Sequence, residues 1–131
     1  MVEATRQLDS ASSSPRGCVE EALSILVNRV FEEPDVGLFF STATLEEGER
    51  LDYLIEHLVK PYHDAFVPLL QSAMDAGQLS CNDPEVVFWI LVSGISRTVS
   101  YHCVVEHLSP VANDPQHFHA AVLQAALSML N

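Results

Sequence analysis

The segment NDPEVVFWILVSG, residues 82–94, decides the fold class of this chain. Its Asn-Asp-Pro start is typical of a helix N-terminus, with a capping side chain followed by proline in the first turn. The seven residues that follow Glu85 are all apolar. A helix that is apolar on every side is covered on more than one face. We therefore predict a long, largely buried helix that continues to about Leu108, before a Ser-Pro pair.

The last helix is predicted to begin in the same way, at Asn113-Asp114-Pro115, and it carries only a narrow polar strip. Two consecutive helices of this kind are too apolar for the outside of a 131-residue monomer, where such a patch marks an interface. We therefore expect a homodimer formed through these two helices. The alternative is that both are central helices of a monomeric bundle. The residues expected at the dimer interface are Val87, Ile90, Gly94, Thr98, Tyr101, Val105, Phe118, Val122, Ala125 and Met129.

The first half of the chain also shows helical periodicity. Ser14-Pro15 repeats the cap-then-proline start, and apolar residues recur at three- and four-residue steps to about residue 32. Residues 36–40 form a short apolar patch that suits a one- or two-turn helix. A second long helix starts near Leu45 and ends at Ala76-Gly77, with its apolar stripe in phase through two prolines.

These segments predict an all-α fold, a helical bundle of about five helices in one domain over residues 15–131. Residues 1–14 end in a small, polar serine run and are expected to be a disordered tail or the remnant of a linker. The alternation of apolar and polar residues that is typical of strands does not occur.

The net charge and the cysteine content limit the classes of function and the cellular compartment that we expect. Six Lys and Arg residues stand against 18 Asp and Glu residues, a net charge of -12, so this chain lacks the basic face that binds DNA or an anionic membrane. Three cysteines are an odd number, which favours free thiols in a reducing cytoplasm. We expect a cytoplasmic protein that neither spans nor binds a membrane.

No recognisable catalytic or phosphate-binding motif occurs, so we expect no enzyme and no cofactor. In the segment HCVVEH, residues 102–107, His102 with Glu106 and Cys103 with His107 are each spaced i,i+4. The two pairs point about a hundred degrees apart around the helix, and neither completes a metal site without ligands from another helix. We therefore expect no bound metal.

Aromatic and histidine side chains from several helices could converge. Such residues form a core or line a small-molecule pocket, and tyrosine, tryptophan and histidine supply the polar groups that a pocket needs. Pro61 and Pro68 kink their helix and leave two carbonyls without their usual partners, so the pocket is expected between this helix and the first one. The candidate pocket residues are Phe31, Phe40, His57, Tyr62, His63, Phe66, Trp89 and Tyr101.

The segment AMDAGQL, residues 73–79, followed by Asp83-Pro84-Glu85 at the start of a long apolar helix, resembles the C-terminal half of TetR-type transcriptional regulators. The resemblance covers roughly residues 15–130. It implies an all-α domain that binds a small-molecule effector and dimerises through its last two helices as a four-helix interface. The helix-turn-helix of such regulators lies N-terminal to this half, and nothing before Pro15 supplies it.

The resemblance therefore leads us to expect the effector-sensing and dimerisation domain of a TetR-type regulator. Its effector would be small and largely apolar, and DNA would be reached only through the missing N-terminal helix-turn-helix. The chain would be either an excised domain or a protein that has lost its DNA-binding helix-turn-helix. The alternatives are a structural or protein-interaction bundle without a ligand, and a helical metal-binding protein.

Overall fold

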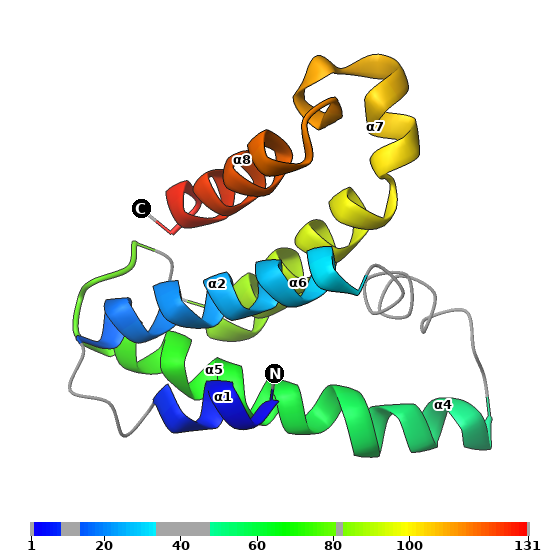
Figure 1. Cartoon of the computed structure of the whole chain (residues 1–131). Helices are drawn as coiled ribbons and strands as arrows, with labels where there is room; N and C mark the ends of the chain where they lie inside the picture. Colours follow the sequence, from blue (N-terminus) through cyan, green and yellow to red (C-terminus); the bar gives the residue numbers. More distant parts are fainter. Residues whose placement is uncertain (1, 9–13, 34–47, 81–82, 131) are drawn as a thin grey trace.

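The computed structural model describes residues 2–8, 14–33, 48–80 and 83–130 (Figure 1). Throughout these residues the chain is helical and contains no strand, so the predicted all-α fold is confirmed. The short helix expected at 36–40 and the serine run lie outside the described residues. The helices are α1 (Val2–Gln7), α2 (Pro15–Glu32), α4 (Glu49–Leu54), the π-helical segment η3 (Ile55–Val59), α5 (Lys60–Asp75), α6 (Pro84–Ser100), α7 (His102–Leu108), the 3-10 segment η4 (Pro110–Ala112) and α8 (Pro115–Ser128).

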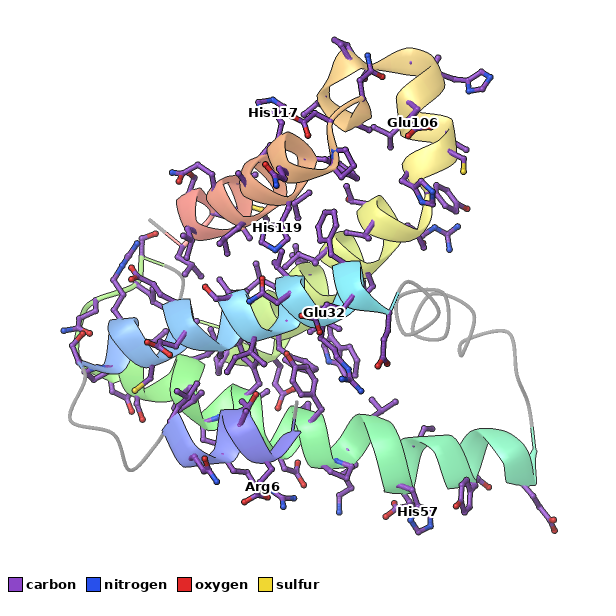
Figure 2. All side chains as sticks on the ribbon, in the orientation of Figure 1. Arg6, Glu32, His57, Glu106, His117 and His119 are labelled. Atoms are coloured by element: carbon purple, nitrogen blue, oxygen red, sulfur yellow. The ribbon has the colours of Figure 1, made fainter. Side chains whose placement is uncertain are left out.

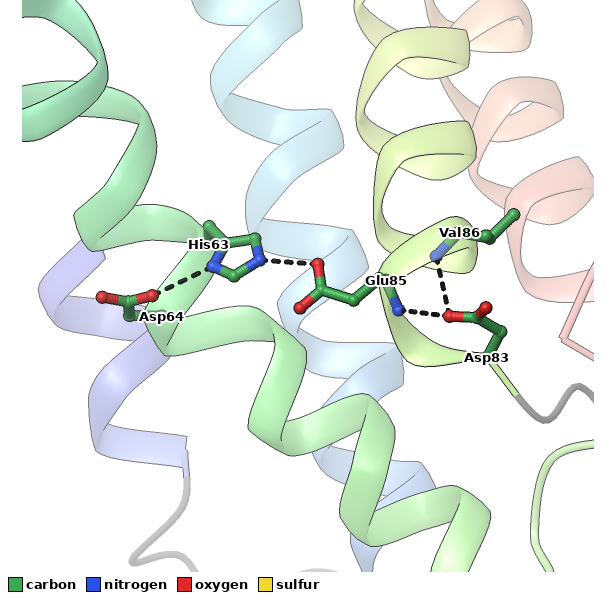
Figure 3. Close-up of polar contacts among 5 residues, drawn as sticks. All are labelled: His63, Asp64, Asp83, Glu85 and Val86. Carbon is green, nitrogen blue, oxygen red and sulfur yellow. Dashed lines mark hydrogen bonds and ion pairs between the residues drawn. The ribbon is translucent and has the colours of Figure 1, made fainter. Parts of the chain in front are cut away.

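Three helices start with the predicted cap and proline. The Ser14 side chain accepts a hydrogen bond from the backbone N–H of Gly17 at 3.1 Å, and Asp114 accepts one from Gln116 at 3.1 Å. Asp83 accepts two, from Glu85 at 3.1 Å and from Val86 at 3.3 Å (Figure 3). Each cap satisfies an N–H group that the helix leaves unpaired, which is worth about 1 kcal/mol.

The core forms around α2, which packs against α5, α6 and α8. In Figure 1, α2 lies between the α1–α5 layer and α8. The buried face of α2 is the stripe predicted from periodicity, and its members are Val19, Ala22, Leu23, Leu26, Val27 and Val30. From α5 and α6 it meets the fully buried rings of Tyr62, Phe66 and Phe88.

The long proline-containing helix was predicted to be continuous but kinked at its two prolines. In the structure a π-helical segment interrupts it. A π-helical segment, Ile55–Val59, separates α4 from α5 and ends two residues before Pro61. Pro61 has no N–H group and its ring crowds the carbonyl four residues earlier, and a wider π turn relieves that clash. Pro68, by contrast, lies inside α5 without ending it. The helix ends at Asp75, and two residues later Gly77 has a φ of +71° and the N–H of Gln78 donates to the carbonyl of Ala73 at 2.9 Å.

The single helix predicted to run to Leu108 is wrong, because the chain bends at Tyr101 between α6 and α7. Just before the bend, two side-chain hydroxyl groups donate hydrogen bonds to backbone carbonyls of the preceding turn. Thr98 Oγ1 donates to the Gly94 carbonyl at 2.6 Å, and Ser100 Oγ donates to the Arg97 carbonyl at 3.1 Å. Hydroxyls that bond back to a preceding turn commonly bend helices. The bend turns α7 away from the axis of α6 (Figure 1).

The predicted tail is also wrong over residues 2–7, which form α1 and pack against α5. Thr5 of this helix is fully buried, and the Cys18 thiol lies 3.1 Å from the Leu8 carbonyl. These contacts give the segment a partner that its polar composition alone does not reveal. None of the described helices has the length and apolar character needed to cross a membrane.

Candidate functional site

An apolar groove with a volume of about 340 Å³ lies between α6 and α8. Seven of the ten predicted interface residues line it: Ile90, Gly94, Thr98, Phe118, Val122, Ala125 and Met129. The other lining residues are Leu91, Ile95, Val111, Ala121 and Ala126. The two most apolar helices of the sequence therefore face each other across an open groove, which we call the α6–α8 groove.

The side chains at this groove remain partly in water. Ile90 is 52% exposed and Met129 is 55% exposed, and Val86 and Trp89 extend the exposed apolar surface along α6. At Gly94, an added Cβ would find no other atom within 4 Å, so the groove is open above this position. Exposed apolar surface that gathers in this way marks an interaction site.

Three predicted interface residues lie outside the groove. Val87 is partly buried against the core. Tyr101 lies at the bend after α6, where the Arg97 guanidinium stands 4.5 Å from its ring centre. Val105 lies beyond the bend on α7, so the bend separates it from the groove that residues 90–98 share with α8.

None of the cavities given by the described residues is lined by more than one of the predicted pocket residues. Tyr62 and Phe66 are core residues, and their ring centres lie 5.8 Å and 5.7 Å from that of Phe88. Burial raises the pKa of the Tyr62 hydroxyl. His57 points away from the other helices and contacts the Tyr53 ring at 4.3 Å between centres (Figure 2). Phe40 lies outside the described residues, so its predicted role is untested.

His63 joins α5 to the first turn of α6 (Figure 3). Its Nδ1 lies 2.9 Å from Asp64 Oδ1 and its Nε2 lies 2.7 Å from Glu85 Oε2. Carboxylate oxygens only accept hydrogen bonds, so both ring nitrogens donate when the imidazole is protonated. The hydrogen bonds to Asp64 and then to Glu85 raise the pKa of His63. The ring also lies against Phe88 and Trp89, which makes this residue a clamp between two helices.

A second cavity, of about 180 Å³, lies where the end of α2, the α6–α7 bend, η4 and the start of α8 meet. We call it the α7 cavity. Of the predicted pocket residues, Phe31 lines it. The site forms at the α6–α7 bend, which is absent from the single helix predicted to run to Leu108, so it could not be predicted from the sequence. The lining residues are Phe31, Val99, His102, Glu106, Ala112, Pro115 and Phe118.

A third cavity lies on the surface of α2, among Ile25, Asn28, Arg29 and Glu32. None of these three cavities is lined by Tyr62, Phe66 or Trp89. Over the described residues, no group of three or more His, Cys, Asp or Glu side chains is arranged to hold a metal ion.

Comparisons with protein-family models, with curated proteins and with solved structures find no match for this chain.

Proposed function

We propose that this chain is the effector-sensing and dimerisation domain of a TetR-type regulator, and that two copies associate through their α6–α8 grooves in a four-helix interface. DNA would be contacted only by a separate helix-turn-helix module. The observation that carries the proposal is the open apolar groove between α6 and α8. The free thiols of Cys18 and Cys103 suit a cytoplasmic protein.

Charge favours a second copy as the occupant of the groove. The chain carries a net charge of -12, so two copies repel each other over most approaches. Helix α8 contains no Asp, Glu, Lys or Arg, and α6 contains none from Val86 to Ser96. Two copies that meet through these segments bring no carboxylates into the contact.

Burial supplies the driving force for this association. Ile90 and Met129 each have about half of their surface in water. Covering the rest of such a side chain stabilises a complex by about 1 kcal/mol, and several neighbouring side chains gain in the same way. Gly94, Ala121 and Ala125 are small and let helix backbones approach closely across the contact.

The test is a charge placed in the groove. In Gly94→Glu the new Cβ meets no neighbouring atom within 4 Å in the single chain, and two such carboxylates would oppose each other in the proposed dimer. Light scattering over micromolar concentrations should give twice the monomer mass for the unaltered protein and the monomer mass for Gly94→Glu. Ser72→Glu adds the same charge to an exposed position of α5 and should remain dimeric.

Circular dichroism should give the same helix content for both variants. A monomeric mass for the unaltered protein at all concentrations would contradict the dimer. A dimeric Gly94→Glu variant would place the interface elsewhere.

The close packing of Tyr62, Phe66 and Phe88 favours a second candidate, a structural helical bundle without an effector. A thermal-shift screen of small apolar molecules separates the two candidates. A ligand that binds the protein and raises its melting temperature supports effector sensing.

A further inference from the structure

The α7 cavity combines apolar walls with one polar edge. The rings of Phe31 and Phe118 meet edge to face, with centres 5.5 Å apart, and Val99 and Ala112 complete the apolar part. His102 and Glu106, spaced i,i+4 on α7, supply the polar edge. Figure 2 shows Glu106 on α7, near the turn that leads to α8.

The charge at this edge is negative. Within the described part of the chain, the Glu106 carboxylate makes no hydrogen bond or ion pair, so it is available to a ligand. His102 Nδ1 lies 3.3 Å from the Val99 carbonyl, and a carbonyl only accepts, so this nitrogen carries the proton. In the neutral tautomer Nε2 is then an acceptor, and the Cys103 thiol lies 3.4 Å from it. The thiol donates to this nitrogen, so the Glu106 carboxylate is the lining group that favours a ligand that donates hydrogen bonds.

The cavity also sets the size of the ligand. Apolar cavities of about 150 Å³ admit benzene, so a volume of about 180 Å³ admits one ring with a short substituent. A ligand of this size would lie with its ring against Phe31 and Phe118 and its substituent at the polar edge.

We propose that the α7 cavity binds a small amphipathic cation, with its apolar ring against Phe31 and Phe118 and its ammonium group on Glu106. The inference names a site and a ligand class for the effector sensing proposed above, and it rests on that function. It places the ligand at the α6–α7 bend rather than between α2 and the proline-containing helix.

Isothermal titration calorimetry with benzylamine, benzyl alcohol and benzoate tests the ligand class. The three probes share a ring and differ in charge. Glu106 is exposed and water screens its charge, so benzylamine should bind about threefold more tightly than benzyl alcohol. Benzoate should bind most weakly. Equal affinity for benzylamine and benzyl alcohol, or no binding of benzylamine at millimolar concentrations, would overturn the proposal.

Variants test the site. Glu106→Gln keeps the shape of the side chain and should weaken the binding of benzylamine about threefold while leaving that of benzyl alcohol unchanged. Glu21→Gln makes the same charge change on an exposed position of α2, about 15 Å along the helix from Phe31, and should change neither affinity. Unchanged benzylamine affinity in Glu106→Gln would refute the role of this carboxylate.

Ala112→Leu fills the cavity and should abolish binding of both probes, with circular dichroism as the check on folding. Binding that persists in folded Ala112→Leu would place the ligand elsewhere. A failure of the cationic ligand class can be distinguished from a failure of the proposed function. A dimer that binds neutral or anionic molecules instead would retain effector sensing and overturn only the cationic ligand class.

Discussion

At the scale of single residues, His63 illustrates how the setting of a side chain changes its role. The sequence analysis placed His63 among the pocket residues because a histidine beside a kinked helix supplies a polar group. In the structure its two ring nitrogens bind Asp64 and Glu85 instead, and the ring packs on Phe88 and Trp89. No spacing rule connects His63 with Glu85, because the pairing depends on how α6 packs against α5.

This clamp predicts a pH dependence of stability. The carboxylates raise the pKa of folded His63 above its usual value of 6.5, so the folded state binds the proton more tightly than the unfolded state. The stabilisation is therefore complete below about pH 6.5 and is lost as pH rises through the folded pKa. We expect the free energy of unfolding of the unaltered protein to fall by up to about 1 kcal/mol over this range, relative to His63→Gln.

Urea denaturation from pH 5.5 to 8.5, at one protein concentration, measures this difference. Subtracting the His63→Gln profile removes the contribution of the other histidines and of dimerisation. Parallel pH profiles for the two proteins would show that the clamp carries no net charge interaction.

At the scale of elements, the end of α5 depends on one backbone conformation. Gly77 has a φ of +71° and lies just after the helix, where the N–H of Gln78 bonds to the Ala73 carbonyl. A side chain in this conformation is strained, so Gly77→Ala should lower the free energy of unfolding by about 1 kcal/mol. Urea denaturation measures the change.

Ala76→Gly serves as the matched comparison. Ala76 lies one position earlier, with a φ of -80° that any residue adopts, and glycine there acts only by added freedom of the unfolded chain. If Gly77→Ala were neutral or stabilising, the left-handed conformation at Gly77 would not be required to end helix α5.

Helix starts and buried faces were the predictable part of the fold. The caps at Ser14, Asp83 and Asp114 and the buried stripe of α2 follow from local hydrogen bonding and from the helical period, which a sequence displays directly. The π-helical segment before Pro61 and the bend at Tyr101 could not be predicted in the same way. Apolar residues stay in phase across the Tyr101 bend, so the pattern gives no sign of it. Because the bend brings α7 to the end of α2, the α7 cavity could not be predicted either.

The apolar surface of α6 and α8 is easier to predict from sequence than the placement of the aromatic rings, for a physical reason. An excess of apolar residues over what a small monomer can bury is visible in composition, and it identified seven residues that line the α6–α8 groove. Aromatic residues at helical spacing are equally compatible with a core and with a pocket. Only the packing of Tyr62 and Phe66 on Phe88 assigns these rings to the core.

At the scale of the whole molecule, Phe118 connects the two candidate sites. It is 5% exposed and lines both the α6–α8 groove and the α7 cavity. A ligand in the cavity therefore contacts a side chain that also borders the proposed dimer contact. If binding repositions this ring, ligand affinity and dimer affinity are coupled. Because each dimer holds two ligands, dimer affinity changes by the square of the factor by which dimerisation changes the affinity of each site.

Sedimentation equilibrium with and without saturating benzylamine measures one side of this linkage. Titration calorimetry above and below the dimer dissociation constant measures the other. We expect ligand affinity to change by about fivefold or more, the lower end of typical coupling between sites, and the dimer dissociation constant to change by the square of that factor. Phe118→Leu preserves an apolar contact but removes the shared ring, so it should reduce the coupling more than it reduces either affinity. A dimer dissociation constant that does not respond to saturating ligand would show that the groove and the cavity act independently, since equilibrium linkage requires the effect to appear in both measurements or in neither.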